Sequence, residues 1–461
     1  MSEHILFLTG RLAEASLARV LAELPDPAFT YRVHTLPLKV AGLMTTDMVC
    51  RRLPETFGAD RIVLPGRCRG ELAVVERRFG VAVERGPDDL KDLPEYFGGV
   101  RVAPDLARYR VRMFAEIVDA PEVSPEAVLG RARQYRDWGA DVIDLGCLPG
   151  TPFPHLERCI DLLKSDGMAV SVDSLDETEL LRGGRAGADY LLSLTETSLE
   201  LLEHVDSIPI LIPAEHGDLD SLERAVQRVA STGRPFLIDP ILDPIHFGFT
   251  ESLVRYRDAR ARFPDAGMLM GIGNLTELTD ADTGGMNTLL LGIASELAID
   301  NVLTTQVSEH ARSALREVDL GRRMMLAAAE TQSLPRGISR ELLQLHERAP
   351  FPYDTEEIKA FAAAVRDPSY RVQVSEDGIH VYNRDGLQSG ADPFALYPQL
   401  RVETDASHAF YLGVELARAE IAWQLGKRYV QDEPLRWGRA VASGTGPGTD
   451  GEPTTPGREG T

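Results

Sequence analysis

The run AVSVD, residues 169–173, is a short apolar segment that ends on a carboxylate. Three other runs have the same form, namely VID at 142–144, FLID at 236–239 and MLMGIGN at 268–274. A polar residue at the end of a buried strand is typical of the catalytic face of a (β/α)8 barrel, because the loops after the strands carry the functional side chains there. These four runs therefore predict a TIM barrel and the place of its chemistry.

The predicted barrel extends over residues 108–330, where short apolar runs alternate with amphipathic segments. We predict eight strands, at residues 110–118, 142–145, 169–172, 190–194, 209–212, 236–238, 268–271 and 301–304. Eight βα units in roughly 220 residues have the size of such a barrel. An open, doubly wound sheet shows the same alternation and is the alternative.

Two smaller folded segments flank the predicted barrel, so the chain is α/β with three parts. Residues 1–100 contain three strand-like runs, each followed by a helical pattern, which predicts a small Rossmann-like α/β domain. The acidic stretch GPDDLKDLPEYFGG, residues 86–99, is expected to be a linker. Residues 350–438 hold a hairpin signal around Asp377-Gly378 and then a long helical pattern, which predicts a small α+β module. Residues 439–461 are rich in Gly, Pro and Thr and are predicted to be a disordered tail.

Composition limits the classes of function. The 461 residues include 49 basic and 71 acidic side chains, and the net charge of -22 argues against a general nucleic-acid binder. No apolar stretch approaches the length of a membrane span and the first residues lack a signal pattern, so we expect a cytoplasmic protein with no membrane partner. The four cysteines form neither a C-x-x-C pair nor a zinc spacing, which favours reduced thiols.

The polar strand ends indicate the kind of ligand. Asp173 and Asp239 are carboxylates that can each accept two parallel hydrogen bonds, which suits a neutral heterocycle with an amino-pyrimidinone edge. Asn274 adds one donor and one acceptor, which matches a ring nitrogen whose protonation changes. Alternatively, each aspartate only caps the helix that follows it. Glu116, near the end of the first strand, faces either the ligand or the solvent outside the barrel.

Residues 108–330 resemble a known family in the runs AVSVDSLDETELLRGGRAGADYLLSLT at 169–195, FLIDPILDPIHFGF at 236–249 and MLMGIGNLTEL at 268–278. The family is the pterin-binding barrel shared by dihydropteroate synthases and methyltetrahydrofolate:corrinoid methyltransferases. The resemblance implies that Asp173 and Asp239 hold the pterin and that Asn274 contacts its reactive nitrogen. Asp144 is grouped with these pterin residues, although it is the one expected to be structural.

The chain departs from dihydropteroate synthases where their diphosphate and metal are bound. Their Arg-Lys pair after the seventh strand is replaced by Asn274-Leu275, and the Arg and His at the eighth strand end by Thr304 and Gln306. The Asn-Asp pair after the fourth strand reads Leu192-Ser193. The magnesium-binding Asn of the first strand has no counterpart in FAEIVDAP, so Mg is possible but unsupported by the sequence, and no residue is assigned as a metal ligand. A diphosphate leaving group needs such cations and donors.

Two further candidate sites lie outside the strand ends. Arg11, Arg67 and Arg69 each lie between a strand and a helix start in the first domain, and we hypothesise that they bind a phosphate group at a domain interface. The alternative is an ordinary βα turn with solvated arginines. His246, close to Asp243, is a candidate catalytic acid or base because histidine titrates near neutral pH.

The function expected from these features is that of a pterin-dependent transferase, similar to the dihydropteroate-synthase-related proteins of tetrahydromethanopterin biosynthesis, a branch of one-carbon metabolism. It would join a dihydropterin methyl diphosphate to an arylamine of the ribofuranosylaminobenzene phosphate type. The expected partners are thus a pterin and a phosphorylated arylamine, and a homodimer is compatible with the sequence. Methyl transfer from a methyl-pterin to a corrinoid protein and a non-catalytic pterin-binding scaffold are the alternatives.

Overall fold

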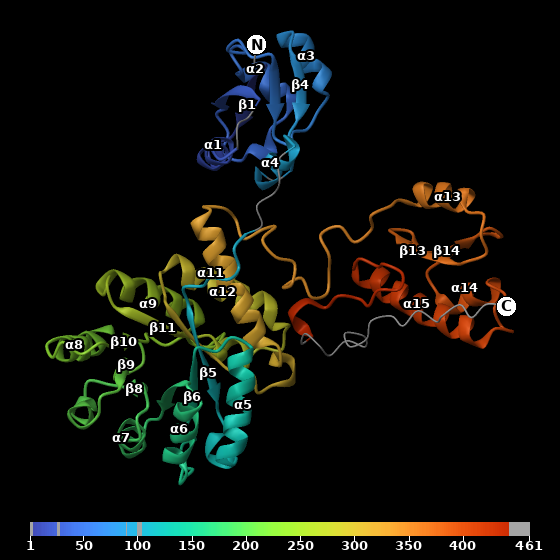
Figure 1. The fold of residues 1–461 in the computed structure, drawn as a ribbon. Helices are drawn as coiled ribbons and strands as arrows, with labels where there is room; N and C mark the ends of the chain where they lie inside the picture. Colours follow the sequence, from blue (N-terminus) through green and yellow to red (C-terminus); the bar gives the residue numbers. More distant parts are fainter. Residues whose placement is uncertain (1–2, 25–27, 89, 99–103, 442–461) are drawn as a thin grey trace. The chain divides into compact units, whose positions relative to one another are not determined.

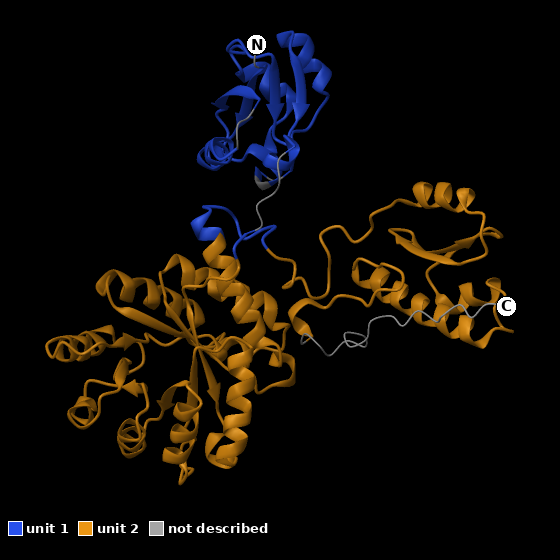
Figure 2. Ribbon diagram, in the orientation of Figure 1, with its two compact units in different colours: residues 1–105, 328–338 blue, residues 106–327, 339–461 orange. Residues whose placement is uncertain are grey.

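The chain forms two compact units in the computed structural model, which describes residues 3–24, 28–88, 90–98 and 104–441 (Figure 1). Unit 1 comprises Met1–Asp105 and Ala328–Ile338 (Figure 2). Unit 2 comprises Leu106–Ala327 and Ser339–Thr461, and it contains the barrel and the C-terminal module. The predicted tail from residue 442 onward lies outside the described residues, whereas Gly438–Ala440 form a short 3-10 helix.

Unit 1 is a four-stranded parallel sheet in the order β2-β1-β3-β4, which confirms the predicted Rossmann-like α/β domain. Its strands and longer helices are β1 (Glu3–Thr9), α1 (Glu14–Ala22), β2 (Phe29–Thr35), α2 (Thr46–Arg52), β3 (Arg61–Leu64), α3 (Leu72–Phe79) and β4 (Ala82–Arg85). Strand β1 is buried on both faces, because Leu6 and Leu8 pack in a core with residues of α2 and α3, whereas Ile5 and Phe7 pack with residues of α1.

The stretch expected to be a linker is folded instead. A 3-10 helix over Leu90–Asp92 continues into α4 (Leu93–Tyr96), and Leu93 is buried. Leu90, Leu93 and Phe97 belong to the core beside β1, and Phe97 lies 4.5 Å from Phe29 between ring centroids. These three apolar residues follow a helical spacing that the surrounding acidic and turn-forming residues obscured in the sequence.

Eight parallel strands close into a barrel in unit 2, which confirms the predicted (β/α)8 fold and excludes the open sheet. The strands are β5 (Arg112–Ile117), β6 (Val142–Gly146), β7 (Ala169–Asp173), β8 (Tyr190–Leu194), β9 (Ile208–Leu211), β10 (Leu237–Ile238), β11 (Gly267–Gly271) and β12 (Asn301–Thr304). Strand β12 pairs with β5, and this pairing closes the ring.

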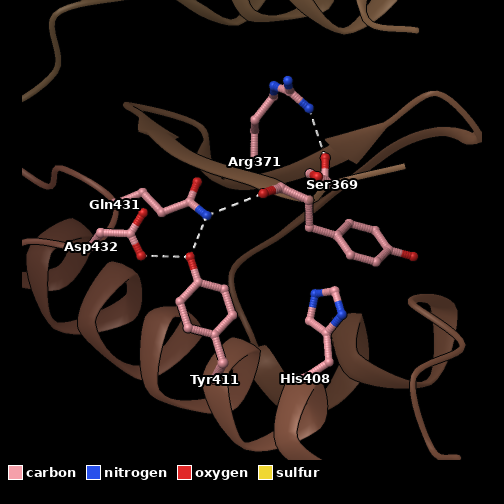
Figure 3. A pocket seen from close by; sticks show the side chains of 7 residues that line it. Ser369, Arg371, His408, Tyr411, Gln431 and Asp432 are labelled. Carbon is pink, nitrogen blue, oxygen red and sulfur yellow. Dashed lines mark hydrogen bonds between the residues drawn. The ribbon is translucent and has the colours of Figure 1, made fainter. Parts of the chain in front are cut away.

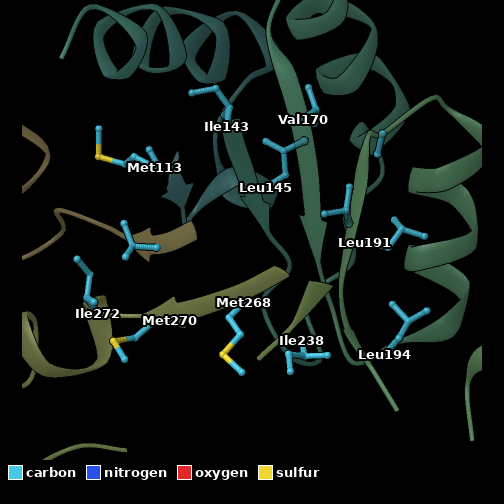
Figure 4. Packing of buried hydrophobic residues seen from close by; sticks show 14 of the residues in the cluster. Met113, Ile143, Leu145, Val170, Leu191, Leu194, Ile238, Met268, Met270 and Ile272 are labelled. Atoms are coloured by element: carbon cyan, nitrogen blue, oxygen red, sulfur yellow. The ribbon is translucent and has the colours of Figure 1, made fainter. Parts of the chain in front are cut away.

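Helices surround the barrel strands. They are α5 (Pro125–Asp137), α6 (Leu156–Ser165), α7 (Glu177–Arg185), α8 (Leu219–Ala230), α9 (Phe249–Arg262), α10 (Gly273–Thr276), α11 (Thr283–Glu296) and α12 (Ala314–Glu330). After β8 the connection holds only a 3-10 helix, Leu199–His204. The largest apolar core lies between strands and helices and includes Met113, Ile143 and Val170 (Figure 4).

Alternate strand residues face the barrel interior, where Phe114, Val142, Leu192 and Leu269 form a second apolar cluster. Because successive strand residues point to opposite sides, the residues two positions after Phe114 and Val142 face inward as well. This alternation brings Glu116 and Asp144 onto the inner face, above the apolar floor.

The C-terminal module is a three-stranded antiparallel sheet packed with helices, which confirms the predicted α+β type. Its elements are α13 (Thr355–Ala364), β13 (Arg371–Ser375), β14 (Gly378–Asn383), β15 (Gly386–Gly390), α14 (Pro393–Leu396) and α15 (Ala406–Leu425). The expected hairpin joins β13 to β14, with Ser375 paired to Gly378. Strand β15 was not predicted, since its residues GLQSG carry little apolar pattern. Among the helices of the described residues, none is both long and apolar enough to cross a bilayer.

Candidate functional site

Three carboxylates meet at the carboxyl ends of the first three barrel strands. Glu116 on β5 lies opposite Asp144 on β6, and Asp173 ends β7 beside Gly146. One carboxylate oxygen from each of Glu116, Asp144 and Asp173 lies within 4.8 Å of the corresponding oxygens of the other two. We call these three residues the acidic cluster. Asp144 is fully buried, whereas Glu116 and Asp173 are partly exposed at the mouth of the barrel.

Burial and mutual repulsion make the acidic cluster harder to ionise. Burial, followed by repulsion from Asp173 and Glu277, raises the pKa of Glu116 to about 7. Burial, followed by the charges of Asp173 and Glu116, raises the pKa of Asp144 well above its usual range. The pKa of Asp173 is raised by burial as well. The three acids of the cluster therefore keep their protons to a higher pH than isolated carboxylates do.

The hydrogen bonds to the acidic cluster come from neutral serine hydroxyls. Ser171 on β7 donates to Asp144 Oδ1, and Ser193 on β8 donates to Asp173 Oδ1 at 2.7 Å. Ser193 has a φ of 73° at an irregularity in the pairing of β8 with β9. Left-handed backbone at a non-glycine residue is uncommon and often accompanies functional sites. Asp144 Oδ2 is buried and has no hydrogen-bond partner among the described residues.

Asp239 follows the short strand β10 at the same face of the barrel. Its Oδ1 accepts hydrogen bonds from the backbone N–H of Ile241 at 2.7 Å and from the hydroxyl of Tyr256 at 2.6 Å. Burial raises the pKa of Asp239 to about 6, against the lowering effect of these hydrogen bonds, and the charge of Asp173 adds to the rise. Asp173 and Asp239 thus interact electrostatically across the mouth.

The loop after β10 is held by a buried guanidinium. Arg255 on α9 donates to the backbone oxygen of Pro240 at 2.6 Å and to Asp243 Oδ2 at 2.8 Å. The same carboxylate oxygen lies 3.4 Å from His216 Nε2, on the loop after β9. Ile241 has a φ of 71°, so Arg255 stabilises a backbone conformation that few β-branched residues adopt.

Two other predicted site residues are more exposed. Asn274 lies on α10 directly after β11, and its Nδ2 donates to the backbone oxygen of Leu242 at 2.9 Å, so its oxygen and its second N–H are left to face a ligand. His246 is exposed on the β10–α9 loop with a φ of 69°. The ion-pair partners of Asp243 are Arg255 and His216, rather than the neighbouring His246.

The three arginines of the hypothesised phosphate site belong to unit 1, and the acidic cluster belongs to unit 2. Arg11 follows β1, and Arg67 and Arg69 follow β3; all three are exposed. Arg67 Nε lies 3.5 Å from a carboxylate oxygen of Asp88. The arginines therefore lie at the carboxyl ends of two adjacent strands of the unit 1 sheet.

Sequence reasoning assigned no role to several residues that organise the mouth, namely Ser193, His216, Arg255 and Tyr256. Ser193 carried the same signal as the aspartates, because it is a polar residue near the end of an apolar run. Arg255 and Tyr256 lie within a helix, and no pattern in the sequence connects them with Asp243 and Asp239. Glu116, whose direction was left open, faces inward.

A separate cavity of about 460 Å³ lies in the C-terminal module (Figure 3). Its polar side chains bind one another: Gln431 donates to the hydroxyl of Tyr411 at 2.7 Å, and Tyr411 donates to Asp432 at 2.8 Å. The ring of His408 packs against Tyr370 at 5.9 Å between centroids. These contacts pair three of the polar side chains of the cavity with one another. The acidic cluster has a buried carboxylate oxygen without a partner among the described residues and is the stronger candidate.

The fold and the site define a (β/α)8-barrel protein with an acidic cluster at the carboxyl ends of its strands. Residues 3–88 match a family described as "Family of unknown function (DUF6513)". The chain is also similar to an uncharacterized protein of Methanocaldococcus jannaschii, with 27% identity over 525 residues that cover 94% of this chain and 98% of the relative.

Two solved structures are similar to about half of the chain. The 7,8-dihydropteroate synthase of Vibrio fischeri ES114 has 14% identity and a TM-score of 0.38, and the match covers 49% of this chain and 94% of that one. The dihydropteroate synthase of Thermus thermophilus, in complex with 6HMPPP, has 21% identity and a TM-score of 0.36, with 47% and 94% covered.

Proposed function

We propose that the barrel mouth binds a pterin and that the protein is a pterin-dependent transferase of the dihydropteroate synthase type. One observation carries the proposal: Asp173 and Asp239 present their carboxylates to the same mouth from β7 and β10. In both residues the hydrogen bonds from described residues go to Oδ1. The Oδ2 atoms are therefore left to accept N–H groups from a ligand.

The chemistry of a pterin fits these two acceptors. Its amino-pyrimidinone edge offers adjacent N–H donors, and a carboxylate that accepts two of them forms a strong, charge-assisted pair. Such donors would also relieve the cost of ionising these partly buried acids. Below them, the interior cluster that includes Leu192 and Leu269 gives a planar ring an apolar floor.

The loops around the mouth present apolar side chains to solvent. Leu175 after β7, Phe247 after β10, Leu278 after β11 and Val307 after β12 are all more than half exposed. Exposed apolar residues on several loops of one face supply surface for a partly aromatic ligand. These exposed apolar residues favour the binding of a second aromatic substrate, such as an arylamine, beside the pterin.

In the proposed reaction the amine nitrogen attacks the methylene carbon of a dihydropterin methyl diphosphate. The C–N bond forms, the C–O bond breaks, the diphosphate leaves with the electron pair, and the amine loses a proton to a base. The arylamine phosphate and a place in tetrahydromethanopterin biosynthesis are proposed on the sequence resemblance alone. Arg11, Arg67 and Arg69 of unit 1 are proposed to bind a phosphate group.

Titration of the protein with a 6-hydroxymethyl-dihydropterin, followed by calorimetry in the presence of EDTA, tests the pterin site. We expect micromolar-scale binding, a loss of at least tenfold in Asp239→Asn, and a change below threefold in the control Asp300→Asn. Asp300 is also an acid with a raised pKa, but it precedes β12 at the opposite end of the barrel. Unchanged binding in both Asp239→Asn and Asp239→Ala would contradict the proposal.

Methyl transfer to a corrinoid is the second candidate. The observation that favours it is the position of Asn274 directly after β11, the seventh strand of the barrel. Dihydropteroate synthases carry their Arg-Lys pair after this strand. Turnover of a methyl-pterin with cob(I)alamin, and none with an arylamine, would select this reaction. Pterin binding without turnover in either assay would select the scaffold.

A further inference from the structure

The acidic cluster gathers three carboxylates, none of which has an ion-pair partner within the described part of the chain. Its hydrogen bonds from described residues come from Ser171 and Ser193, and the charges that act on it belong to other acids. Carboxylates gathered in this way are stabilised either by protons or by a metal ion. The positions of the carboxylate oxygens and the space around the acidic cluster indicate whether protons or a metal ion stabilise it.

We propose that Glu116, Asp144 and Asp173 form a binding site for a divalent cation. One oxygen of each residue lies within 4.8 Å of the other two, so a single ion can contact all three. The buried Asp144 Oδ2 has no protein partner among the described residues, and a wholly buried acceptor without a partner is costly. A cation bound by the cluster removes that cost.

The backbone at position 146 leaves room for the cluster. A Cβ atom on Gly146 would lie 2.8 Å from Glu116 Oε1, closer than carbon and oxygen atoms pack. Glycine at the end of β6 therefore lets the Glu116 carboxylate extend across that strand toward Asp173, which is paired with Gly146. The site thus depends on a missing side chain as well as on three that are present.

The donor set indicates the kind of ion. All three ligands are carboxylate oxygens, which suit hard cations such as Mg²⁺ or Mn²⁺, whereas no cysteine or histidine belongs to the cluster of described residues. Mg²⁺ is commonly held by one or two carboxylates and keeps positions for water and for substrate oxygens. The ion would give the mouth a positive charge for an anionic substrate group.

This site shares Asp173 with the proposed pterin site but does not depend on it. A carboxylate has about four acceptor positions, so Asp173 can contact an ion, Ser193 and a ligand N–H at once. The pterin titration described above is made in EDTA, and the metal titration is made without pterin. Failure of one proposal is therefore distinguishable from failure of the other.

Titration of the EDTA-treated, dialysed full-length protein with MnCl2 at pH 7.5, followed by the electron paramagnetic resonance signal of free Mn²⁺, tests the site. We expect one saturable Mn²⁺ ion per chain and a metal-induced rise in melting temperature. Asp144→Asn and Glu116→Gln should each weaken binding at least tenfold and abolish that rise. Asp239→Asn, which removes a carboxylate of the same mouth outside the cluster, should change Mn²⁺ affinity less than threefold.

The apo variants separate a metal site from a structural acid. Replacing one repelling carboxylate by its isosteric amide should raise the melting temperature of the metal-free protein, although Mn²⁺ no longer stabilises it. Glu116→Gln leaves the buried Asp144 in place. If Asp144→Asn fails to fold, the Mn²⁺ affinity of Glu116→Gln therefore tests the metal site. The proposal is overturned if the wild-type protein shows no saturable Mn²⁺ binding below 1 mM, on the order of the weakest protein sites, or if Glu116→Gln binds Mn²⁺ as tightly as the wild type.

Discussion

Gly146 lies so close to the carboxylate of Glu116 that a Cβ atom at position 146 would come within 2.8 Å of Glu116 Oε1. The same Cβ atom would also lie 3.1 Å from the Cα of Val118. We expect Gly146→Ala to displace the Glu116 carboxylate first, because the end of a glutamate side chain moves more readily than the backbone. The variant should lose at least tenfold in Mn²⁺ affinity while its free energy of unfolding falls by less than about 2 kcal/mol. Mn²⁺ titration and urea unfolding measure the two effects.

Gly130→Ala is the matched control for this substitution. Gly130 lies on α5, and a Cβ atom there would meet nothing within 4 Å. Alanine favours a helix over glycine by about 1 kcal/mol, so this variant should be slightly more stable and should bind Mn²⁺ as the wild type does. Equal Mn²⁺ affinity in Gly146→Ala and Gly130→Ala would show that the space beside Glu116 has no effect on Mn²⁺ binding.

Asp239 should make the protein less stable as the pH rises. Its pKa in the folded protein is about 6, against an ordinary value of 3.8, so folding favours the protonated form. This contribution to stability is complete below pH 3.8 and is lost as the pH rises through about 6. The shift of roughly two pKa units corresponds to about 3 kcal/mol.

Asp239→Asn removes this titration, since an amide keeps the acceptor for Ile241 and Tyr256 without a charge. Urea unfolding in EDTA at pH 5 and at pH 7.5 measures the effect. We expect the variant to gain stability relative to the wild type between these two pH values. The same pH dependence in both proteins would mean that Asp239 ionises normally.

Two substitutions at Ser193 separate the effect of its backbone strain on stability from the effect of its hydrogen bond on ligand binding. Both Ser193→Ala and Ser193→Gly remove the hydroxyl that donates to Asp173 Oδ1, so both should weaken pterin binding by a similar factor. Glycine also accepts the φ of 73°, whereas alanine does not, so the glycine variant should be more stable by about 1 kcal/mol. Calorimetric pterin titration and thermal unfolding test the pair, and a more stable alanine variant would contradict the role of the backbone.

The sequence was sufficient to predict the barrel and three of its acids because each signal is local. Asp144, Asp173 and Asp239 each end an apolar run, and the strand geometry then directs them to one face. Ser193 and Glu116 lie near the ends of their strands, but their contacts depend on strand register and on the missing side chain of Gly146. The contact of Tyr256 with Asp239 depends on the rotation of a helix, for which the sequence contains no signal.

Arg322 on α12 should be the most costly charged residue to remove from the barrel. Its side chain is fully buried, it donates to Asp141 at 2.5 Å and to Asp319 at 2.7 Å, and its guanidinium carbon lies 3.6 Å from the centre of the Tyr109 ring. It also donates to the backbone oxygen of Val111, just before β5, so it connects the last helix with the first strand of the barrel.

Arg322→Met leaves two carboxylates without this partner and should cost about 3–5 kcal/mol in the free energy of unfolding. Arg133→Met, which breaks an exposed pair with Asp166, should cost less than about 1 kcal/mol. Urea unfolding followed by circular dichroism compares the two, and a loss at Arg322 as small as that at Arg133 would mean that the buried pairs contribute no more than surface ones.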